Sequence, residues 1–285
     1  MTEMPRNDGM ILDGTVAIVT GGSRGIGRAI AGALVARGAR VAINGRDPGA
    51  LREAESALRR SAAGGNGRGT GRGGDGDGAE RVLAVQADVS REEDANKLVS
   101  QTIERFGGLD LLVNNAGVGR FANVADMPTD RWREVIDTNV SGVFFCCRAA
   151  LPHLKTRGGG WIINISSLAS ENPFIGGAAY CASKAALNAF TEALMLETRY
   201  DNIRVSMILP GSVQTEFAAP LTSSPAHPSR GPAGAGPSVF TGSATGADWK
   251  LSSDDVARAV IDLIAFPGRS LPSRIDLRPS KPVKR

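Results

Sequence analysis

The sequence has few of the residues that build metal sites and disulfide frameworks. Among 285 residues it contains two histidines, His153 and His227, and three cysteines, Cys146, Cys147 and Cys181. Their spacing matches no zinc motif, and an odd number of cysteines leaves one unpaired in any set of disulfide bonds. We therefore expect no metal site and a reducing, cytoplasmic location.

Long apolar runs are missing as well. No stretch approaches the ~18 consecutive apolar residues of a membrane helix. The first residues include Glu3, Arg6 and Asp8 with no apolar run between them, which is unlike a secretory signal. We expect no membrane span and no leader, and residues 1–11 are interpreted as an extension before the folded domain.

The excess of positive charge is confined to one end of the chain. The formal net charge is +4, and Arg278, Lys281, Lys284 and Arg285 all lie in the last eight residues. The remaining basic residues equal the acidic residues in number. Because the body has no basic stripe, we expect no nucleic-acid partner. The alternative is a nucleic-acid binder that uses the basic tail at residues 280–285.

Composition and apolar patterning fit one α/β domain. Hydrophobic residues make up 42% of the chain and charged residues 22%, as in soluble globular proteins. Short apolar runs alternate with segments of helical apolar spacing, and this alternation predicts strands connected by helices. The predicted strands are residues 15–20, 41–43, 82–85, 109–113, 161–165 and 203–209.

A glycine-rich turn joins the first predicted strand to the first predicted helix. Residues 21–27 read Gly-Gly-Ser-Arg-Gly-Ile-Gly, a G-x-x-x-G-x-G spacing that differs from the commoner G-x-G-x-x-G. Glycine lets the backbone approach an anion, and the N–H groups and dipole of a helix N-terminus favour negative charge. The turn therefore predicts a phosphate cradle, with a purely structural tight turn as the alternative.

The end of the second predicted strand bears on the choice of cofactor. It reads Asn44-Gly45-Arg46, where an NAD-binding domain carries an acid that holds the ribose 2′-hydroxyl. Asn44 is neutral, whereas Arg46 and Arg24 can embrace a 2′-phosphate. We therefore predict NADP(H), with a solvated loop arginine at position 46 as the alternative.

Polar residues follow two further predicted strands. Asp88 comes after residues 82–85, and it either accepts a hydrogen bond from an adenine amino group or caps the helix that follows. After residues 109–113 the chain reads Asn-Asn-Ala-Gly over residues 114–117. Amides and small residues at the carboxyl edge of a strand suit a backbone packed against a ligand.

Asn139 interrupts an apolar stripe of helical spacing over residues 130–151. A polar side chain in such a stripe needs a hydrogen-bond partner. The functional interpretation is a bound water that leads toward Lys184, and the alternative is a core asparagine satisfied by protein groups.

Tyr180 and Lys184 are four residues apart at the start of a predicted helix, so their side chains share one face. A free tyrosine titrates near about 10, and moving its pKa to neutrality takes about 4 kcal/mol. One ammonium at about 4 Å supplies roughly that much at an effective dielectric of about 20. Burial opposes this shift, so a cationic cofactor or hydrogen-bond donors such as Ser167 are also required. The alternative is a surface tyrosine beside a solvated lysine.

Taken together, these motifs resemble the short-subunit branch of the short-chain dehydrogenase/reductase family, of the 3-oxoacyl-[acyl-carrier-protein] reductase type. The resemblance covers residues 12–215 and rests on Thr20-Gly21-x-x-x-Gly25-x-Gly27, Asn114-Asn115-Ala116-Gly117, Asn139, Ser167, Tyr180-x-x-x-Lys184 and Pro210-Gly211. It implies a single Rossmann-like, doubly wound domain over residues 12–279, with a mostly parallel sheet of about seven strands and helices on both faces. It also implies hydride transfer between NADP(H) and a carbonyl or secondary alcohol, most simply that of a 3-oxoacyl or other ketone.

The resemblance also implies roles for individual residues. Tyr180 is expected to be the general acid/base, Ser167 to hydrogen-bond the substrate oxygen, Lys184 to lower the tyrosine pKa, and Asn139 to hold water. Expected cofactor contacts are Gly21, Ser23, Arg24, Gly25, Ile26, Gly27, Asn44, Arg46, Asp88, Val89, Asn115, Ala116, Gly117, Tyr180, Lys184, Pro210, Gly211, Val213 and Thr215. A different class of function, a cofactor-sensing regulatory protein without turnover, is the alternative.

Two segments depart from the family pattern or extend it. Residues 64–78 contain nine glycines in fifteen positions, and we expect a disordered insert there. Residues 216–250, rich in alanine, proline, serine and glycine, are expected to form the substrate loop and act as a lid. The C-terminal segment lacks the family's usual tetramer sequence, so of a homodimer or homotetramer we favour a dimer through the helices that begin near Asp130 and Tyr180.

Overall fold

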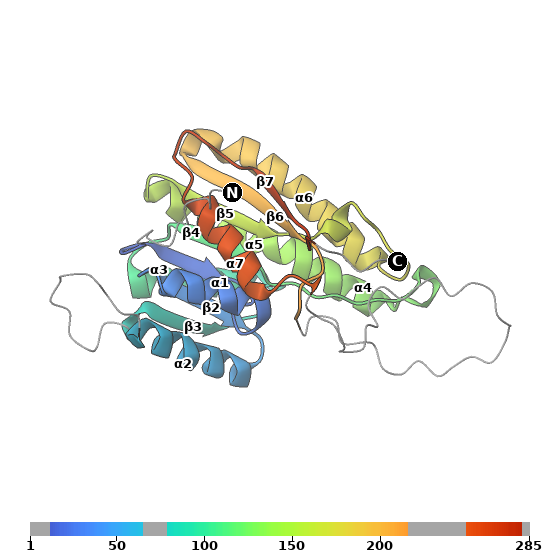
Figure 1. Ribbon diagram of the computed structural model, residues 1–285, viewed down its shortest axis with the longest axis horizontal. Helices are drawn as coiled ribbons and strands as arrows, with labels where there is room; N and C mark the ends of the chain where they lie inside the picture. The colour runs from blue at the N-terminus through green and yellow to red at the C-terminus, as the bar shows by residue number, and fades with distance from the viewer. Residues whose placement is uncertain (1–11, 65–78, 216–248, 281–285) are drawn as a thin grey trace.

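Seven short strands form one sheet at the centre of the protein (Figure 1). The structure is a computed structural model that describes residues 12–64, 79–215 and 249–280. The strands are β1 Val16–Val19, β2 Arg40–Gly45, β3 Val82–Gln86, β4 Leu111–Asn114, β5 Gly160–Ile165, β6 Ile203–Pro210 and β7 Arg274–Leu277. Among the described residues their order is β3-β2-β1-β4-β5-β6-β7, and each neighbouring pair is parallel.

The order of the strands reverses between β1 and β4. Ala17 of β1 lies opposite Val41 of β2 on one side and opposite Leu111 of β4 on the other. The first half of the chain therefore builds outward to β3 and the second half outward to β7. In open parallel sheets the crevice at such a reversal, at the carboxyl ends of the strands, is where ligands bind.

Helices cover both faces of the sheet. They are α1 Gly25–Val35, α2 Pro48–Gly64, α3 Glu92–Phe106, α4 Thr129–Ile136, α5 Gly142–Thr156, α6 Ala178–Thr198 and α7 Ser253–Ile264. A π-helical turn, Asp137–Ser141, joins α4 to α5. Single 3-10 turns are η1 Ala79–Arg81, η2 Val124–Asp126, η4 Leu168–Ser170 and η5 Arg199–Asp201.

The strands are apolar throughout because both of their faces are buried. In β1, Ala17 and Val19 pack with side chains of α1, α2 and α7, whereas Val16 and Ile18 pack with side chains of α3, α5 and α6 (Figure 1). Side chains alternate between the two faces of a strand, so burial on both sides gives a continuous apolar run. The predicted doubly wound α/β fold with a parallel sheet is confirmed.

Several boundaries differ from the sequence predictions. Helix α2 extends to Gly64, so the predicted glycine-rich insert begins inside a helix, and residues 65–78 lie outside the described residues. The apolar stripe at residues 130–151 is divided among α4, the π-helical turn and α5. Most of the predicted lid, residues 216–248, also lies outside the described part of the chain, as do residues 1–11 and 281–285. Their predicted roles remain predictions.

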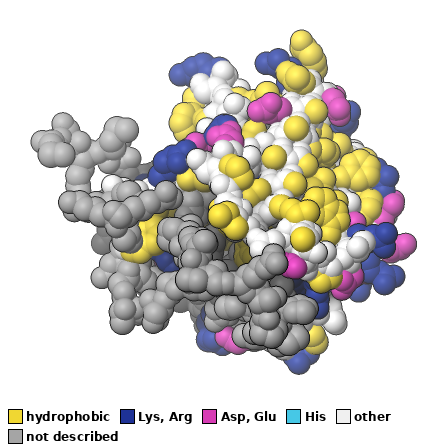
Figure 2. Space-filling view, turned by 90° about the vertical axis from the view of Figure 1, so that its right-hand side faces the viewer, with side chains coloured by type: hydrophobic (Ala, Val, Ile, Leu, Met, Phe, Trp, Pro, Cys, Tyr) yellow, Lys and Arg dark blue, Asp and Glu magenta, His cyan; other side chains and the backbone are white. Residues whose placement is uncertain are grey.

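The surface combines apolar and charged regions. Figure 2 shows hydrophobic side chains over the middle of the face seen from the right of Figure 1, with charged side chains mostly toward its edges. Large apolar side chains that are exposed include Trp132 on α4, Phe144 on α5 and Leu196 on α6. Within the described residues, the helices are too short or too polar to cross a membrane.

Candidate active site

The glycine turn between β1 and α1 requires glycine because the backbone is crowded on both sides. Gly21 has φ +65°, and a Cβ there would lie 2.9 Å from the Cα of Ala116. A Cβ at Gly27 would lie 2.3 Å from the carbonyl oxygen of Gly21. Gly25 has φ +52° and begins α1. The first turn of α1 contains no acidic side chain, so its N–H groups and dipole favour an anion.

Asn44 braces this turn from β2. Its Oδ1 accepts a hydrogen bond from the Gly21 N–H at 2.9 Å, and its Nδ2 donates to the carbonyl oxygen of Ala87 at 3.0 Å. The side chain is buried, and both ends of its amide have protein partners. Its side chain thus supports the glycine turn, and the predicted contact between Asn44 and the cofactor remains a prediction.

Asn115 and Ala116 are held by Thr20, which the sequence analysis placed in the glycine motif but gave no role. The Thr20 Oγ1 accepts hydrogen bonds from the N–H groups of Asn115 and Ala116 at 2.9 and 3.0 Å. The Asn115 Nδ2 in turn donates to the carbonyl oxygen of Thr20 at 2.9 Å. The backbone of residues 115–116 therefore packs against the glycine turn, and the Asn115 amide is directed at protein backbone.

Asn114 links neighbouring elements of the fold through hydrogen bonds. It is buried in the sheet, and its Nδ2 donates to the Asn164 Oδ1 at 2.9 Å. The Asn164 Nδ2 continues the chain of hydrogen bonds to the Thr191 Oγ1 at 2.8 Å. These bonds link β4, β5 and α6.

The remaining predicted contacts surround the same turn. Ser23 is buried, and Ile26 packs against the core beneath α7. Val89 lies against the start of α5, where its carbonyl oxygen is 3.0 Å from the position of a Cβ on Gly142. Arg24 is exposed and is the residue before α1.

The segment after β6 returns over the glycine turn. The Gly211 N–H donates to the carbonyl oxygen of Leu277 at 2.8 Å, which fixes the end of the strand Ile203–Pro210. Val213 pairs with Leu251 in an isolated parallel bridge. The side chain of Thr215 lies 3.6 Å from the position of a Cβ on Gly25. Thr215 thus reaches the glycine turn from the segment after β6, and the predicted cofactor contact of Val213 remains a prediction.

Arg46 lies within a cluster of charges at the carboxyl ends of β2 and β3. Its guanidinium is 4.0 Å from the Asp88 carboxylate and 3.8 Å from the Glu134 carboxylate. Glu134 also accepts hydrogen bonds from Arg120 at 2.7 Å and from Arg131 at 3.1 Å. Burial alone would raise the pKa of Glu134, but the hydrogen bonds from these two arginines outweigh it and hold the pKa below its usual range.

Asp88 has one carboxylate oxygen in use. Its Oδ1 accepts hydrogen bonds from the Ser90 N–H at 3.1 Å and the Ser90 hydroxyl at 2.8 Å, in a turn that leads into α3. Its Oδ2 faces Arg46. The predicted alternative was a cap of the following helix, but Oδ1 serves the turn before α3, whose N-cap position is Arg91. The predicted adenine contact of Asp88 remains a prediction.

Ser167, Tyr180 and Lys184 meet at the carboxyl end of β5. Ser167 precedes the 3-10 turn Leu168–Ser170, and its Oγ accepts a hydrogen bond from the Ala169 N–H at 3.1 Å. Its side chain also shares a hydrogen bond with the Tyr180 hydroxyl. The Lys184 Nζ lies one helical turn further along α6, 5.8 Å from the Tyr180 ring centroid, and donates to the carbonyl oxygen of Ile165 at 2.8 Å. The predicted shared helix face is present.

Burial dominates the titration of both residues. It raises the pKa of Tyr180 to about 12, although the hydrogen bond from Ser167 acts in the opposite direction. It lowers the pKa of Lys184 to about 8. In the protein by itself, burial opposes the lowering of the tyrosine pKa and the Ser167 hydrogen bond favours it, as the sequence argument expected. The Lys184 ammonium donates to the Ile165 carbonyl oxygen, and burial is the largest influence on the pKa of the phenol.

Asn139 sits in the π-helical turn and is bonded to protein groups. Its Oδ1 accepts from the Val118 N–H at 2.8 Å, and its Nδ2 donates to the Val118 carbonyl and the Ser183 Oγ at 2.9 and 3.0 Å. The side chain therefore matches the satisfied-asparagine alternative, and the predicted water-holding role of Asn139 remains a prediction. Gly117 permits the approach, since a Cβ there would lie 3.2 Å from the Asn139 Oδ1.

Ser183 is a residue that the sequence analysis did not name. Its hydroxyl donates to the Tyr180 carbonyl oxygen at 2.7 Å and accepts from Asn139. It thereby connects the π-helical turn to the first turn of α6. Its spacing of three residues from Tyr180 was the only signal in the sequence.

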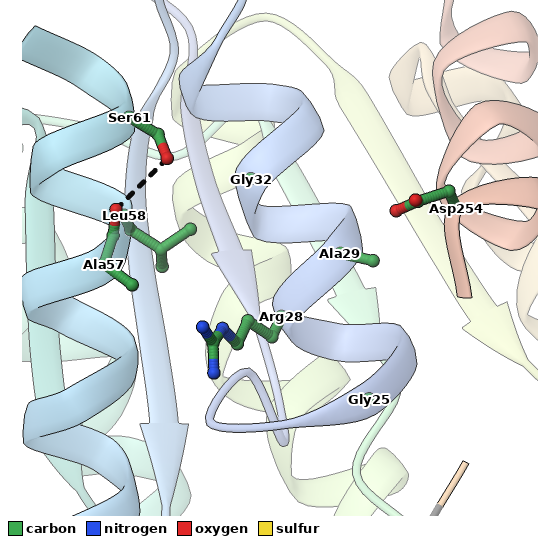
Figure 3. Close-up of a pocket in the computed structure, with 8 residues that line it drawn as sticks. All are labelled: Gly25, Arg28, Ala29, Gly32, Ala57, Leu58, Ser61 and Asp254. Atoms are coloured by element: carbon green, nitrogen blue, oxygen red, sulfur yellow. Dashed lines mark hydrogen bonds between the residues drawn. The ribbon is translucent and has the colours of Figure 1, made fainter. Parts of the chain in front are cut away.

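A separate hollow of about 420 Å³ lies beside α1. Figure 3 shows Arg28 and Asp254 on different sides of that helix, with Ser61 bonded to Ala57 within α2. The Arg28 guanidinium is 3.5 Å from the Glu53 carboxylate. Of the predicted site residues only Gly25 lines this hollow, so the hollow is distinct from the cluster of Ser167, Tyr180 and Lys184.

The geometry as a whole fits a bound dinucleotide and a hydroxyl group that donates a proton. The cradle is a space that a Cβ at Gly21 or Gly27 would fill, as close approach to a pyrophosphate requires. The tyrosine and serine hydroxyls lie at the same edge of the sheet, where a carbonyl oxygen can be held by two hydrogen bonds.

Known proteins share this fold and sequence. Residues 15–68 and 73–226 match the family model described as short chain dehydrogenase. A 2-(R)-hydroxypropyl-CoM dehydrogenase from Xanthobacter autotrophicus is 37% identical over 70% of this chain and 75% of its own. A 3-oxoacyl-[acyl-carrier-protein] reductase from Synechocystis is 34% identical over 75% of this chain and 80% of its own.

A solved structure agrees with these relatives. A metagenomic short-chain oxidoreductase in complex with NADP has a TM-score of 0.72 and 32% identity, covering 95% of this chain and 99% of that one. The predicted resemblance is confirmed. The protein belongs to the short-chain dehydrogenase/reductase family of nicotinamide-dependent oxidoreductases, which act on alcohol and carbonyl groups.

Proposed function

We propose that this protein is an NADP(H)-dependent reductase of 3-oxoacyl or other ketones, with Tyr180 as general acid/base. The observation that carries the proposal is the meeting of Ser167, Tyr180 and Lys184 beside the glycine cradle. A family relative bound to NADP supports the choice of cofactor.

The bound nicotinamide would supply the hydride. Tyr180 keeps its proton at neutral pH because burial raises its pKa to about 12. It is therefore in the protonation state that carbonyl reduction needs, and it donates that proton to the carbonyl oxygen. The Ser167 hydroxyl, already bonded to Tyr180, holds the same oxygen in place.

Lys184 is proposed to act on the ribose and on the phenol. Its buried ammonium has one carbonyl partner, Ile165, which leaves two N–H donors for ribose hydroxyls. In the alcohol-oxidising direction Tyr180 must lose its proton first. The positive charge of Lys184 lowers the cost of that step.

Tyr180→Phe tests the proposal directly. We expect NADPH binding, followed by nicotinamide fluorescence, to change less than about threefold, because the ring is retained and only the hydroxyl is lost. Ketone reduction should fall by at least about 10³-fold, because the proton donor is gone. Unchanged turnover in this variant would remove Tyr180 from the mechanism.

We also propose that the protein acts as a single domain over residues 12–279 and associates as a homodimer through α4, α5 and α6. The exposed ring of Phe144 on α5 packs edge-on against Phe190 of α6 at 6.5 Å. With Trp132 on α4, these side chains form an apolar surface of the kind that subunit contacts cover.

A further inference from the structure

Two phenylalanine rings stand beside the proposed proton donor. Phe121 follows β4 and Phe174 precedes α6. Their ring centroids are 5.7 Å apart, and Phe121 also meets Tyr180 edge-on at 5.9 Å. The two loops are joined by a hydrogen bond from the Ala122 N–H to the Gly176 carbonyl oxygen at 3.0 Å. We call Phe121 and Phe174 the aromatic wall.

The backbone is shaped to admit this wall. Gly176 has φ +77°, a conformation that favours glycine. A Cβ at Gly177 would lie 2.6 Å from the ring of Phe174. A side chain at either position would displace the loop or the ring, so the glycines hold Phe174 close to the first turn of α6.

The charged residues next to the wall are directed elsewhere. Arg120, which precedes Phe121, makes two hydrogen bonds to Glu134 at 2.7 and 2.9 Å. Glu171, three residues before Phe174, forms an ion pair with Arg274 of β7. The charges of Arg120 and Glu171 are therefore each neutralised by a partner outside the aromatic wall.

A hollow is lined in part by residues next to the aromatic wall and to Tyr180 in the sequence. It measures about 210 Å³ and is lined by Ala122, Val124, Met127, Thr129, Trp132, Ala178 and Ala179. Ala122 directly follows Phe121, and Ala179 directly precedes Tyr180. An apolar cavity of about 150 Å³ accommodates benzene in another protein, so this hollow has room for a ring.

Apolar side chains are also left exposed around these features. Val124 is 77% exposed and Ile175, next to Phe174, is 87% exposed. Exposed apolar groups that gather at one place mark surfaces that bind apolar partners or ligands. In the sequence, Val124 lies three residues after Phe121, and Ile175 directly follows Phe174.

We propose that the substrate is a ketone with one uncharged, apolar substituent, most simply an aryl group, which packs against Phe121 and Phe174. This inference rests on the proposed function. The carbonyl oxygen lies at Ser167 and Tyr180, the hydride passes from the reduced nicotinamide to the carbonyl carbon, and the Tyr180 proton passes to the oxygen. Aromatic rings attract other rings edge-on or offset, and an unpaired carboxylate would lose hydration against them.

The test compares two ketones of opposite character with NADPH, acetophenone and acetoacetate. We expect kcat/KM to be at least about 10-fold higher for acetophenone. Phe174→Ala should lower kcat/KM for acetophenone by about 10-fold and leave that for butanone, which has no ring, within about twofold. A higher value for acetoacetate, or an equal loss for both acetophenone and butanone in the variant, would overturn the proposal.

A matched control and a second measurement complete the design. Tyr200→Ala removes an exposed aromatic side chain at the other end of α6, roughly 30 Å from Tyr180, and both ketones should be unaffected. Saturation-transfer NMR of acetophenone on wild type and on Phe174→Ala measures the subsite without turnover. Acetophenone binding that depends on Phe174 without any ketone reduction would contradict the proposed function alone; binding that ignores Phe174 would contradict the aryl subsite.

Discussion

At the scale of single residues, burial disfavours the charged form of an ionisable side chain and so shifts its pKa. Lys184 is buried, and its pKa is lowered to about 8. In the unfolded chain a lysine titrates near about 10.4. Between these values the unfolded state holds a proton that the folded state has released, so the free energy of unfolding rises with pH through this window.

Lys184→Met should remove that rise. In the cofactor-free wild type we expect Lys184 to add on the order of 2–3 kcal/mol to the stability between about pH 8 and pH 10. Urea denaturation of both proteins at several pH values measures the difference. Cys146 and Cys147 titrate in both proteins, so only the difference is diagnostic. Parallel pH profiles would show that Lys184 is not held in a desolvated site.

Arg46 decides the proposed preference for NADP(H). Its guanidinium lies 3.8–4.0 Å from two carboxylates without a close hydrogen bond, so it can turn to a 2′-phosphate at low cost. Arg46→Ala should raise the KM for NADPH about 10-fold or more and leave the KM for NADH nearly unchanged. Arg258→Ala, on α7, is the control. A wild type that prefers NADH in initial-rate measurements would contradict the role given to Arg46 and Arg24.

At the scale of elements, the turn between β1 and α1 depends on contacts with the loop after β4. A Cβ at Gly27 would lie 2.3 Å from the Gly21 carbonyl oxygen and 2.4 Å from the Asn115 Nδ2. Neither atom can move without breaking the hydrogen bonds that tie residues 20–21 to residues 115–116. The cradle is thus a joint product of two segments.

Gly27→Ala should therefore damage the cradle. We expect a loss of about 2 kcal/mol or more in the free energy of unfolding and NADPH binding weakened beyond about 10-fold. Gly32→Ala in the same helix is the matched control, because its Cβ would make an ordinary contact, 3.6 Å from the Leu58 Cδ2. That variant should be neutral or more stable by about 0.5–1 kcal/mol. Equal effects of the two substitutions on cofactor affinity would argue against a close approach at Gly27.

At the scale of the whole molecule, the proposed dimer depends on surface that the fold leaves uncovered. Phe144 is 40% exposed although it packs on Phe190. Phe144→Glu should shift the protein from dimer to monomer in light scattering at micromolar concentration, because a charge would be buried in the contact. Phe266→Glu alters a similarly exposed ring after α7 and should leave the mass unchanged. A wild-type monomer would refute the proposed interface. A dimer that survives Phe144→Glu would show that the subunits associate through a different surface.

The sequence by itself determined the features that depend on neighbours along the chain. The run of β-branched residues before Gly21 required a buried strand, the glycines required a tight turn, and the spacing of Tyr180 and Lys184 required one helix face. Alternating strands and helices then implied a parallel sheet with both faces covered, because parallel strands need crossover helices. These are short-range properties, so a local pattern is enough to predict them.

Only the tertiary structure decided how the polar side chains are used. The partners of Asn44 and Asn139 are backbone groups of distant segments, Gly21 and Ala87 for one and Val118 for the other. The pKa of Tyr180 follows from its burial, and Arg46 meets Glu134, a residue far along the chain, only in the folded protein. Hydrogen bonding and desolvation depend on which atoms are brought together in space, and spacing along the chain does not specify that.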